Sequence, residues 1–161
     1  MLAKIEPPHR AKLASLLADT PELTPAEVAV ALELVDAALA TPASPDYRFL
    51  LCEEGDHLLG YACFGPTPMT EACFDLYWLV VDTRARNKGI GRLLVAEVER
   101  EIARASGRMI RVETSSLPSY DPARALYERA GYALASRLRD FYAIGNDLCV
   151  FLKYLEPPSS T

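Results

Sequence analysis

The chain has 161 residues, of which 50% are apolar and 24% charged, a composition typical of globular rather than disordered or fibrous proteins. Its 17 Lys and Arg residues stand against 22 Asp and Glu residues, and the resulting charge of −5 argues against a nucleic-acid-binding protein. The length suits one domain that hides roughly 68–70% of its unfolded surface. We assign residues 1–156 to this domain and residues 157–161 to a flexible tail.

We expect the following elements in chain order: strand 2–5, helix 8–18, helix 25–40, strands 47–52, 57–64 and 74–81, helix 90–105, strand 109–114, helix 122–130, and strands 132–139 and 148–153. The second helix follows Thr24-Pro25-Ala26-Glu27, a capping box with proline at the first helical position. Asp121 is expected to cap the fourth helix, with Pro122 at its first position. The order predicts an α/β protein whose sheet is mixed, because hairpins are embedded in it.

The apolar runs, the N-terminus and the cysteines bear on the location of the protein. Its apolar runs are far shorter than the ~18 residues of a membrane span, and the N-terminus lacks an apolar signal region. We therefore expect a cytoplasmic protein that does not contact membranes. The four cysteines lie in apolar, strand-like stretches without Cys-x-x-Cys spacing, which predicts buried reduced thiols and no metal site; they are Cys52, Cys63, Cys73 and Cys149.

The positive charge is concentrated in one short window. Residues 84–92 contain Arg84, Arg86, Lys88 and Arg92 and no acid, so the window carries +4 and the rest of the chain −9. A helix is expected to begin within this window, directly after strand 74–81. Its N-terminal amides and dipole favour an anion, and two glycines let a ligand approach the backbone. The window therefore indicates a pyrophosphate site, with a solvated basic turn as the alternative.

Two motifs carry a resemblance to a known family. Residues 81–94 resemble the acetyl-CoA-binding motif of GCN5-related N-acetyltransferases (GNAT), whose core Arg/Gln-x-x-Gly-x-Gly/Ala is here Arg86-x-x-Gly89-x-Gly91. Residues 125–132 are similar to the later family motif, in which a Leu/Phe-Tyr pair on a helix precedes Gly-Phe/Tyr. The resemblance implies the GNAT (acyl-CoA N-acyltransferase) fold, a mixed and mostly antiparallel sheet flanked by helices.

The resemblance also implies how acetyl-CoA is held as co-substrate. Backbone amides of residues 87–92 are expected to bind its pyrophosphate, and the edge of residues 79–81 to pair with its pantetheine arm. This strand is expected to splay from the next one and leave a slot for the thioester. The expected cofactor-binding residues are Leu79, Val80, Val81, Arg86, Asn87, Lys88, Gly89, Ile90, Gly91 and Arg92.

Acyl transfer from a thioester to an amine requires a neutral amine, a polarised carbonyl and a proton for the departing thiolate. Because an alkyl amine has a pKa of about 10, a general base helps to supply the nucleophile. Glu113 matches the position of this base in some relatives, although it could instead be tied to Arg111, and Asp75 is the runner-up. Tyr127 matches the family's general acid, with a purely structural packing role as its alternative.

The backbone N–H of Val80 or Leu79 is expected to polarise the carbonyl. The acceptor site is expected to combine aromatic walls with an acid, as suits a small cationic amine. Its candidate residues are the loop Asp140-Phe141-Tyr142, Tyr120, Tyr77 and Trp78, for which ordinary strand-end packing remains an alternative.

These features predict an N-acetyltransferase that moves an acetyl group from acetyl-CoA directly to a primary amine of a small molecule, peptide or protein, without a metal. The alternative is a non-catalytic acyl-CoA sensor that shares the anion site but lacks an accessible acceptor cavity. The sequence leaves a homodimer open.

Overall fold

The computed structural model describes residues 2–44 and 46–155; the predicted tail, residues 157–161, lies outside this part. The element order follows the prediction. The elements are β1 (Leu2–Lys4), α1 (His9–Ala18), α2 (Pro25–Ala40), β2 (Arg48–Glu54), β3 (His57–Pro66), β4 (Cys73–Val81), the 3-10 turn η1 (Thr83–Ala85), α3 (Ile90–Arg104), β5 (Met109–Ser115), the 3-10 turn η2 (Pro118–Tyr120), α4 (Asp121–Arg129), β6 (Ala133–Ala143) and β7 (Asn146–Tyr154).

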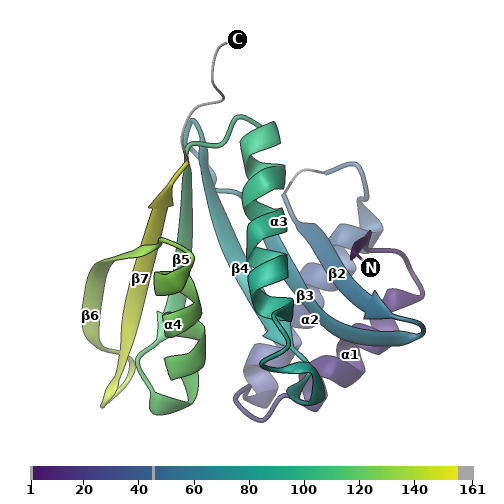
Figure 1. Ribbon diagram of the computed structural model, residues 1–161, viewed down its shortest axis with the longest axis horizontal. Helices are drawn as coiled ribbons and strands as arrows, with labels where there is room; N and C mark the ends of the chain where they lie inside the picture. The colour runs from purple at the N-terminus through teal and green to yellow at the C-terminus, as the bar shows by residue number, and fades with distance from the viewer. Residues whose placement is uncertain (1, 45, 156–161) are drawn as a thin grey trace.

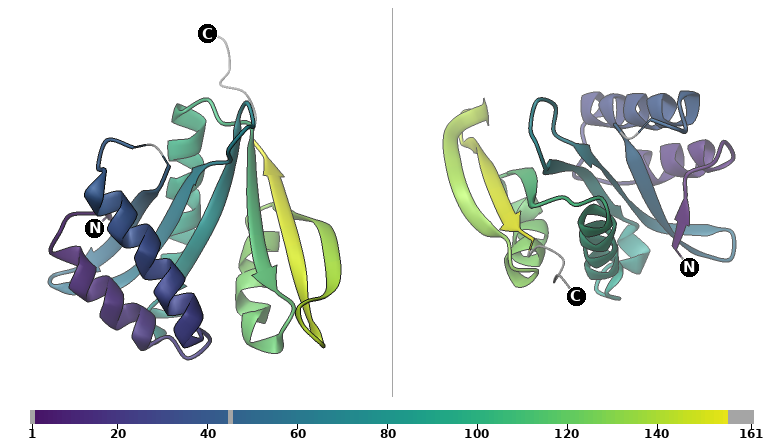
Figure 2. Two further views of the ribbon diagram at one scale, coloured as in Figure 1. Left: turned by 180° about the vertical axis from the view of Figure 1, so that it is seen from behind. Right: turned by 90° about the horizontal axis from the view of Figure 1, so that it is seen from above.

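The strands form one sheet in the order β1-β2-β3-β4-β5-β7-β6. The β4–β5 pair is parallel, and the other neighbouring pairs are antiparallel. Helices α1 and α2 cover one face of the sheet, and α3 and α4 cover the other (Figures 1 and 2). The structure confirms the predicted α/β class and the mixed, mostly antiparallel sheet.

Strands β4 and β5 pair over only part of their length. Their register runs from Cys73 opposite Met109 to Leu76 opposite Val112, and no residue beyond these is paired between the two strands. Figure 1 shows the strands diverging from this point, with the end of β4 leading toward the first turn of α3. The predicted splay is therefore confirmed, and it leaves one edge of residues 77–81 without a strand partner.

A β-bulge in β4 changes which way its side chains face. Cys63 lies opposite Trp78 and Phe64 lies opposite Leu76, so Tyr77 is an extra residue in β4. Both Tyr77 and Trp78 consequently pack into the apolar cluster beneath α1 and α2, whereas Leu76 packs into the cluster beneath α3 and α4. The bulge breaks the alternation that a regular strand imposes on successive side chains.

Two helices show how local sequence specifies the fold. At the start of α2, the Thr24 hydroxyl accepts from the Glu27 amide at 3.2 Å, and the Glu27 carboxylate accepts from the Thr24 amide at 2.7 Å. The predicted capping box is thus confirmed. In α3 an apolar stripe is completely or almost completely buried, which anchors the helix to the sheet; it consists of Leu94, Val95, Val98 and Ile102.

The four cysteines are buried free thiols, as predicted. Burial raises the pKa of the Cys63 thiol. Among the described residues, no group of three or more His, Cys, Asp or Glu side chains could hold a metal ion. None of the helices in residues 2–44 and 46–155 is long and apolar enough to cross a membrane.

Two local predictions are wrong. Asp121 is not the cap of α4 but its first residue; the cap position is Tyr120, and the Asp121 carboxylate pairs with Arg124 instead. Strand β6 is longer than predicted and continues to Ala143, so residues 140–142 belong to a strand rather than to a loop. The turn between β6 and β7 consists of Ile144 and the left-handed Gly145 alone, whereas the sequence pattern predicted a longer loop around this glycine.

Candidate active site

The basic window leads into the start of α3, where backbone amides are left without helical partners. Gly89 is the N-cap residue, with a left-handed φ of 82° and no side-chain cap, and Asn87 is also left-handed at φ 62°. The Leu93 amide donates to the Gly89 carbonyl at 2.9 Å. The amides before it belong to the first helical turn, which has no intrahelical acceptors and carries the positive end of the helix dipole. Residues 87–92 therefore present donors to an anion, and we call them the cradle.

Gly91 is the point where the two sequence motifs pack against each other. A Cβ atom at this position would lie 3.1 Å from Leu126 Cδ2 and 3.7 Å from Val81 Cγ2. The glycine thus lets the first turn of α3 approach both α4 and the end of β4. This close approach places the cradle beside the helix that carries Tyr127.

The positive charges of the window are not all available to a ligand. Arg84 Nη2 lies 2.8 Å from the Asp82 carboxylate, and Arg86 forms a bidentate ion pair with Glu22 at 2.7 and 2.9 Å. Within the described part of the chain, Lys88 and Arg92 form no ion pair. Only these two of the four cations are free to face an anion, a distinction that charge counting in the sequence could not make.

Glu113 stands at the fork between β4 and β5. It directly follows Val112, the last β5 residue paired with β4, and Tyr77 stands at the corresponding position of β4. A cavity of about 130 Å³ opens there, lined by Asp75, Leu76, Tyr77, Arg111 and Glu113. Tyr77 packs on the α1/α2 side of the sheet, so the cavity opens on that side.

The two candidate bases differ in how their oxygens are engaged. Asp75 is 7% exposed, and its carboxylate accepts from Arg111 Nε at 2.6 Å and from the Thr67 hydroxyl at 2.8 Å. The Glu113 side chain is 46% exposed and lies 3.6 Å from Arg111 Nη1. The Asp75 carboxylate thus accepts two short hydrogen bonds, whereas the Glu113 side chain is more exposed and lines the cavity.

Tyr127 lies on the opposite side of the sheet from the cavity. Its ring packs in the α3/α4 cluster against Tyr132 and Phe151, with centroids 5.8 and 6.0 Å apart. Burial raises the pKa of the Tyr127 phenol, so the group is protonated at neutral pH. Its hydroxyl has no hydrogen-bond partner among the residues that the structure describes. The ring therefore has the predicted structural packing, while the hydroxyl proton is uncommitted.

Two of the predicted acceptor-site residues, Tyr120 and Tyr142, are influenced by the same carboxylate, that of Glu27. Burial, followed by the nearby carboxylates of Glu27 and Glu22, raises the pKa of Tyr120 to about 12. Burial, followed by the carboxylates of Glu113 and Glu27, raises the pKa of Tyr142. Tyr120 and Tyr142 thus both lie near Glu27, and Tyr142 also lies near Glu113; we call these four residues the acceptor wall.

The other predicted acceptor residues have different surroundings. Asp140 accepts from the Gly145 amide at 2.7 Å and stabilises the β6–β7 turn. Phe141 is 57% exposed, with its ring edge-on to that of Tyr142 at 5.2 Å. Trp78 packs beneath α1 and α2 because of the bulge. Glu27 was recognisable in the sequence only as part of a helix cap, and Glu22 had no local signal at all.

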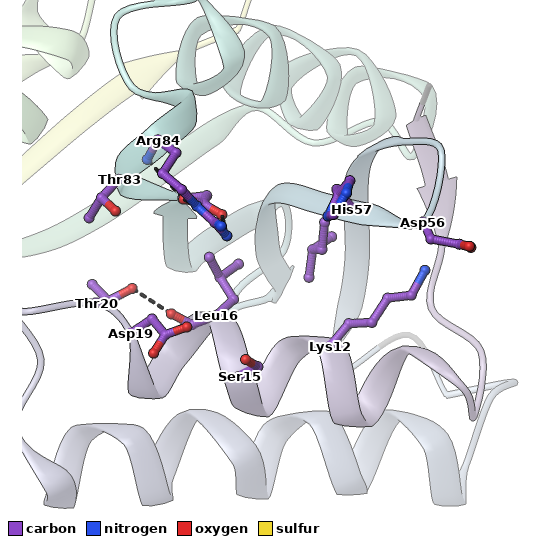
Figure 3. Close-up of a pocket in the computed structure, with 11 residues that line it drawn as sticks. Lys12, Ser15, Leu16, Asp19, Thr20, Asp56, His57, Thr83 and Arg84 are labelled. Atoms are coloured by element: carbon purple, nitrogen blue, oxygen red, sulfur yellow. Dashed lines mark hydrogen bonds and ion pairs between the residues drawn. The ribbon is translucent and has the colours of Figure 1, made fainter.

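A second cavity, of about 180 Å³, is lined by residues of α1, of the β2–β3 turn and of the β4–α3 connection. In Figure 3, residues of α1 line one wall, and His57 and Arg84 line the other. Acids and bases are mixed here: Lys12 pairs with Glu53, and Arg84 pairs with Asp82. None of the predicted site residues lines this cavity.

Comparison with known proteins identifies the family. The acetyltransferase (GNAT) family profile matches residues 14–132. The chain belongs to the GNAT family. A comparison with curated proteins finds no match.

Solved structures agree with the family assignment. A protein from Desulfovibrio desulfuricans assigned to the GNAT family is 37% identical, with 96% of this chain and 98% of that chain covered and a TM-score of 0.91. An aminoglycoside 6′-N-acetyltransferase complexed with coenzyme A is 19% identical, with 99% of both chains covered and a TM-score of 0.78. The ribosomal-protein-S18-alanine N-acetyltransferase from Escherichia coli is 15% identical, with 100% and 97% coverage and a TM-score of 0.77. The last two are similar in fold alone.

The Glu22–Arg86 ion pair makes the stability of this GNAT protein depend on pH. The hydrogen bond from Arg86 is the main cause that holds the pKa of Glu22 below its ordinary value. A lowered folded-state pKa adds stability above the unfolded-state value of about 4.3, and this stability is lost as the pH falls through the folded-state pKa. We expect Glu22→Gln to cost about 1 kcal/mol or less near pH 7, as for other partly exposed ion pairs. Urea unfolding of both proteins should show the difference disappearing in acid; a pH-independent difference would contradict the assignment.

Proposed function

We propose that the protein is an N-acetyltransferase that transfers an acetyl group from acetyl-CoA directly to a primary amine of a small molecule, peptide or protein. One observation carries the proposal: the donor-rich start of α3 lies at the end of β4, where β4 has parted from β5. A diphosphate and an extended amide-containing arm fit these two adjacent surfaces. Membership of the GNAT family supports the same donor.

The cradle residues hold the pyrophosphate of acetyl-CoA through their backbone amides, with Lys88 and Arg92 as the unpaired cations. The free edge of residues 79–81 supplies main-chain donors and acceptors to the pantetheine arm, as a missing neighbour strand would. The amide of Val80 or Leu79 then donates to the acyl oxygen as negative charge develops on it. Coenzyme A in the aminoglycoside 6′-N-acetyltransferase, a protein of the same fold, supports this donor.

Proton transfer is divided between the two sides of the sheet. Glu113, on the cavity side, accepts the proton of the attacking amine directly or through water. Tyr127, on the α3/α4 side, donates its phenolic proton to the departing thiolate. The carboxylates of the acceptor wall favour an amine that arrives as a cation, and Asp75 supports the site by fixing Arg111.

Replacement of Gly89 tests the cradle. Gly89→Ala forces a left-handed alanine, and so does Gly55→Ala in the β2–β3 turn; neither added Cβ meets another atom within 4 Å. Both changes should therefore cost about 1–2 kcal/mol of stability. Calorimetric titration with coenzyme A should show affinity reduced at least about tenfold, or 1.4 kcal/mol, in Gly89→Ala alone. Equal affinity in the two variants would remove the cradle from the site.

Replacement of Tyr127 tests the general acid. With acetyl-CoA and a panel of primary amines and peptides, release of free thiol measures turnover. On an amine that the wild type acetylates, Tyr127→Phe should lower kcat about 10²-fold and leave the affinity for coenzyme A unchanged. Tyr132→Phe is the matched control, because it removes a neighbouring buried hydroxyl outside the slot. Unchanged turnover in Tyr127→Phe would leave the tyrosine a packing role only, and tight coenzyme A binding without any turnover would favour the acyl-CoA sensor.

Glu113→Gln and Asp75→Asn separate the base from its supporting carboxylate. Glu113→Gln should lower kcat/KM about 10²-fold near neutral pH, with the defect shrinking toward the amine pKa of about 10, where the nucleophile is already neutral. Its stability should change by less than about 0.5 kcal/mol. Asp75→Asn should instead destabilise the fold by about 1–3 kcal/mol, because Arg111 loses the closer of its two charged partners. If Glu113→Gln turns over normally at neutral pH, another group must be the base.

A further inference from the structure

Glu22 connects three segments that are far apart in the sequence. It lies between α1 and α2, and its carboxylate accepts from Arg86 Nη1 at 2.7 Å and Nη2 at 2.9 Å. Its backbone carbonyl accepts from the Tyr120 hydroxyl at 3.2 Å. One residue therefore contacts the β4–α3 connection through its side chain and the segment before α4 through its backbone.

The Arg86 end of this connection leads into the cradle. Arg86 Nε donates to the carbonyl of Val81, the last residue of β4, at 3.4 Å. The preceding residue, Ala85, is buried, so the backbone is anchored immediately before Arg86. The backbone of Arg86 continues directly into residues 87–92. An anion that fixes the cradle consequently fixes the base of the Arg86 side chain.

The Glu22 end leads to the acceptor wall. Two residues after Glu22, the capping box of Thr24 fixes Glu27 at the start of α2. Tyr120, which donates to Glu22, is itself part of the acceptor wall. The segment from Glu22 to Glu27 is therefore held at one end by Arg86, the residue before the cradle, and contributes a carboxylate to the acceptor wall at the other.

We propose that Glu22 is a positioning residue that couples occupation of the cradle to the order of the acceptor wall. The inference rests on the proposed function, because it takes coenzyme A as the ligand of the cradle. Arg86 keeps its bidentate pair with Glu22 when the cradle is filled and transmits the restraint to residues 20–27. The acceptor wall is then more completely formed after the acyl donor binds.

Hydrogen exchange with coenzyme A as the probe tests this coupling without knowledge of the amine. In the wild type, saturating coenzyme A should slow exchange of the amides in residues 20–27 by about tenfold, a typical coupling between two sites. In Glu22→Gln the slowing should fall to about twofold or less, with amides of the cradle still protected. Asp36→Asn is the matched control, because Asp36 forms a comparable bidentate pair with Arg10 at 2.6 and 2.9 Å on α1 and α2. This control should retain the wild-type response.

The outcomes distinguish the coupling from the proposed function. Absence of coenzyme A binding to the wild type would overturn both. Binding that leaves residues 20–27 unaffected, or that protects them equally in Glu22→Gln, would overturn the coupling alone. Tyr120→Phe provides a second variant should Glu22→Gln fail to fold, since it removes the hydroxyl that donates to the Glu22 carbonyl. We expect it to weaken the protection of residues 20–27 as well, and full protection in this variant would count against the proposal.

Discussion

The parallel pairing of β4 and β5 ends after four residue pairs, and the whole candidate site depends on this early end. If β4 were paired along its whole length, it would present no main-chain groups to a ligand, and the strands would not part beside Glu113. Because the strands part, residues from both sides of the sheet gain access to one place. The left-handed Gly89 then turns the chain so that the free amides of α3 lie at the end of the same strand. The unpaired edge of β4 and the positive end of the α3 dipole are thus both available to one ligand.

Local sequence signals were sufficient for most of the architecture. The capping box at Thr24 and Glu27 is complete within four residues, and the α3 stripe repeats at helical spacing, so neither depends on distant parts of the chain. The glycine-rich start of α3 was predictable for the same reason, because Gly89, Gly91 and the helix start lie together in the sequence. The family motifs then indicated how these helices and strands are arranged in the fold.

The remaining features depend on contacts that the sequence does not encode locally. The bulge at Tyr77 reverses the direction of Trp78, and no alternation pattern within β4 announces it. Arg86 is separated from Glu22 by 64 positions, so a count of basic residues overestimated the charge available to a ligand. Glu27 satisfied a helix-capping motif completely, which concealed that its carboxylate also influences Tyr120 and Tyr142. A residue that already has one structural explanation is easily overlooked for a second role.

The burial of the four cysteines has a practical consequence for enzymology. Each side chain is almost entirely shielded, and the thiol of Cys63 ionises less readily than a free thiol because it lies in an apolar environment. Thiol reagents react with the thiolate, so the folded protein should consume them slowly. A colorimetric reagent added during turnover would then report the coenzyme A product with little background from the enzyme. The same shielding means that a rapid reaction of the protein's own thiols would signal loss of the native core.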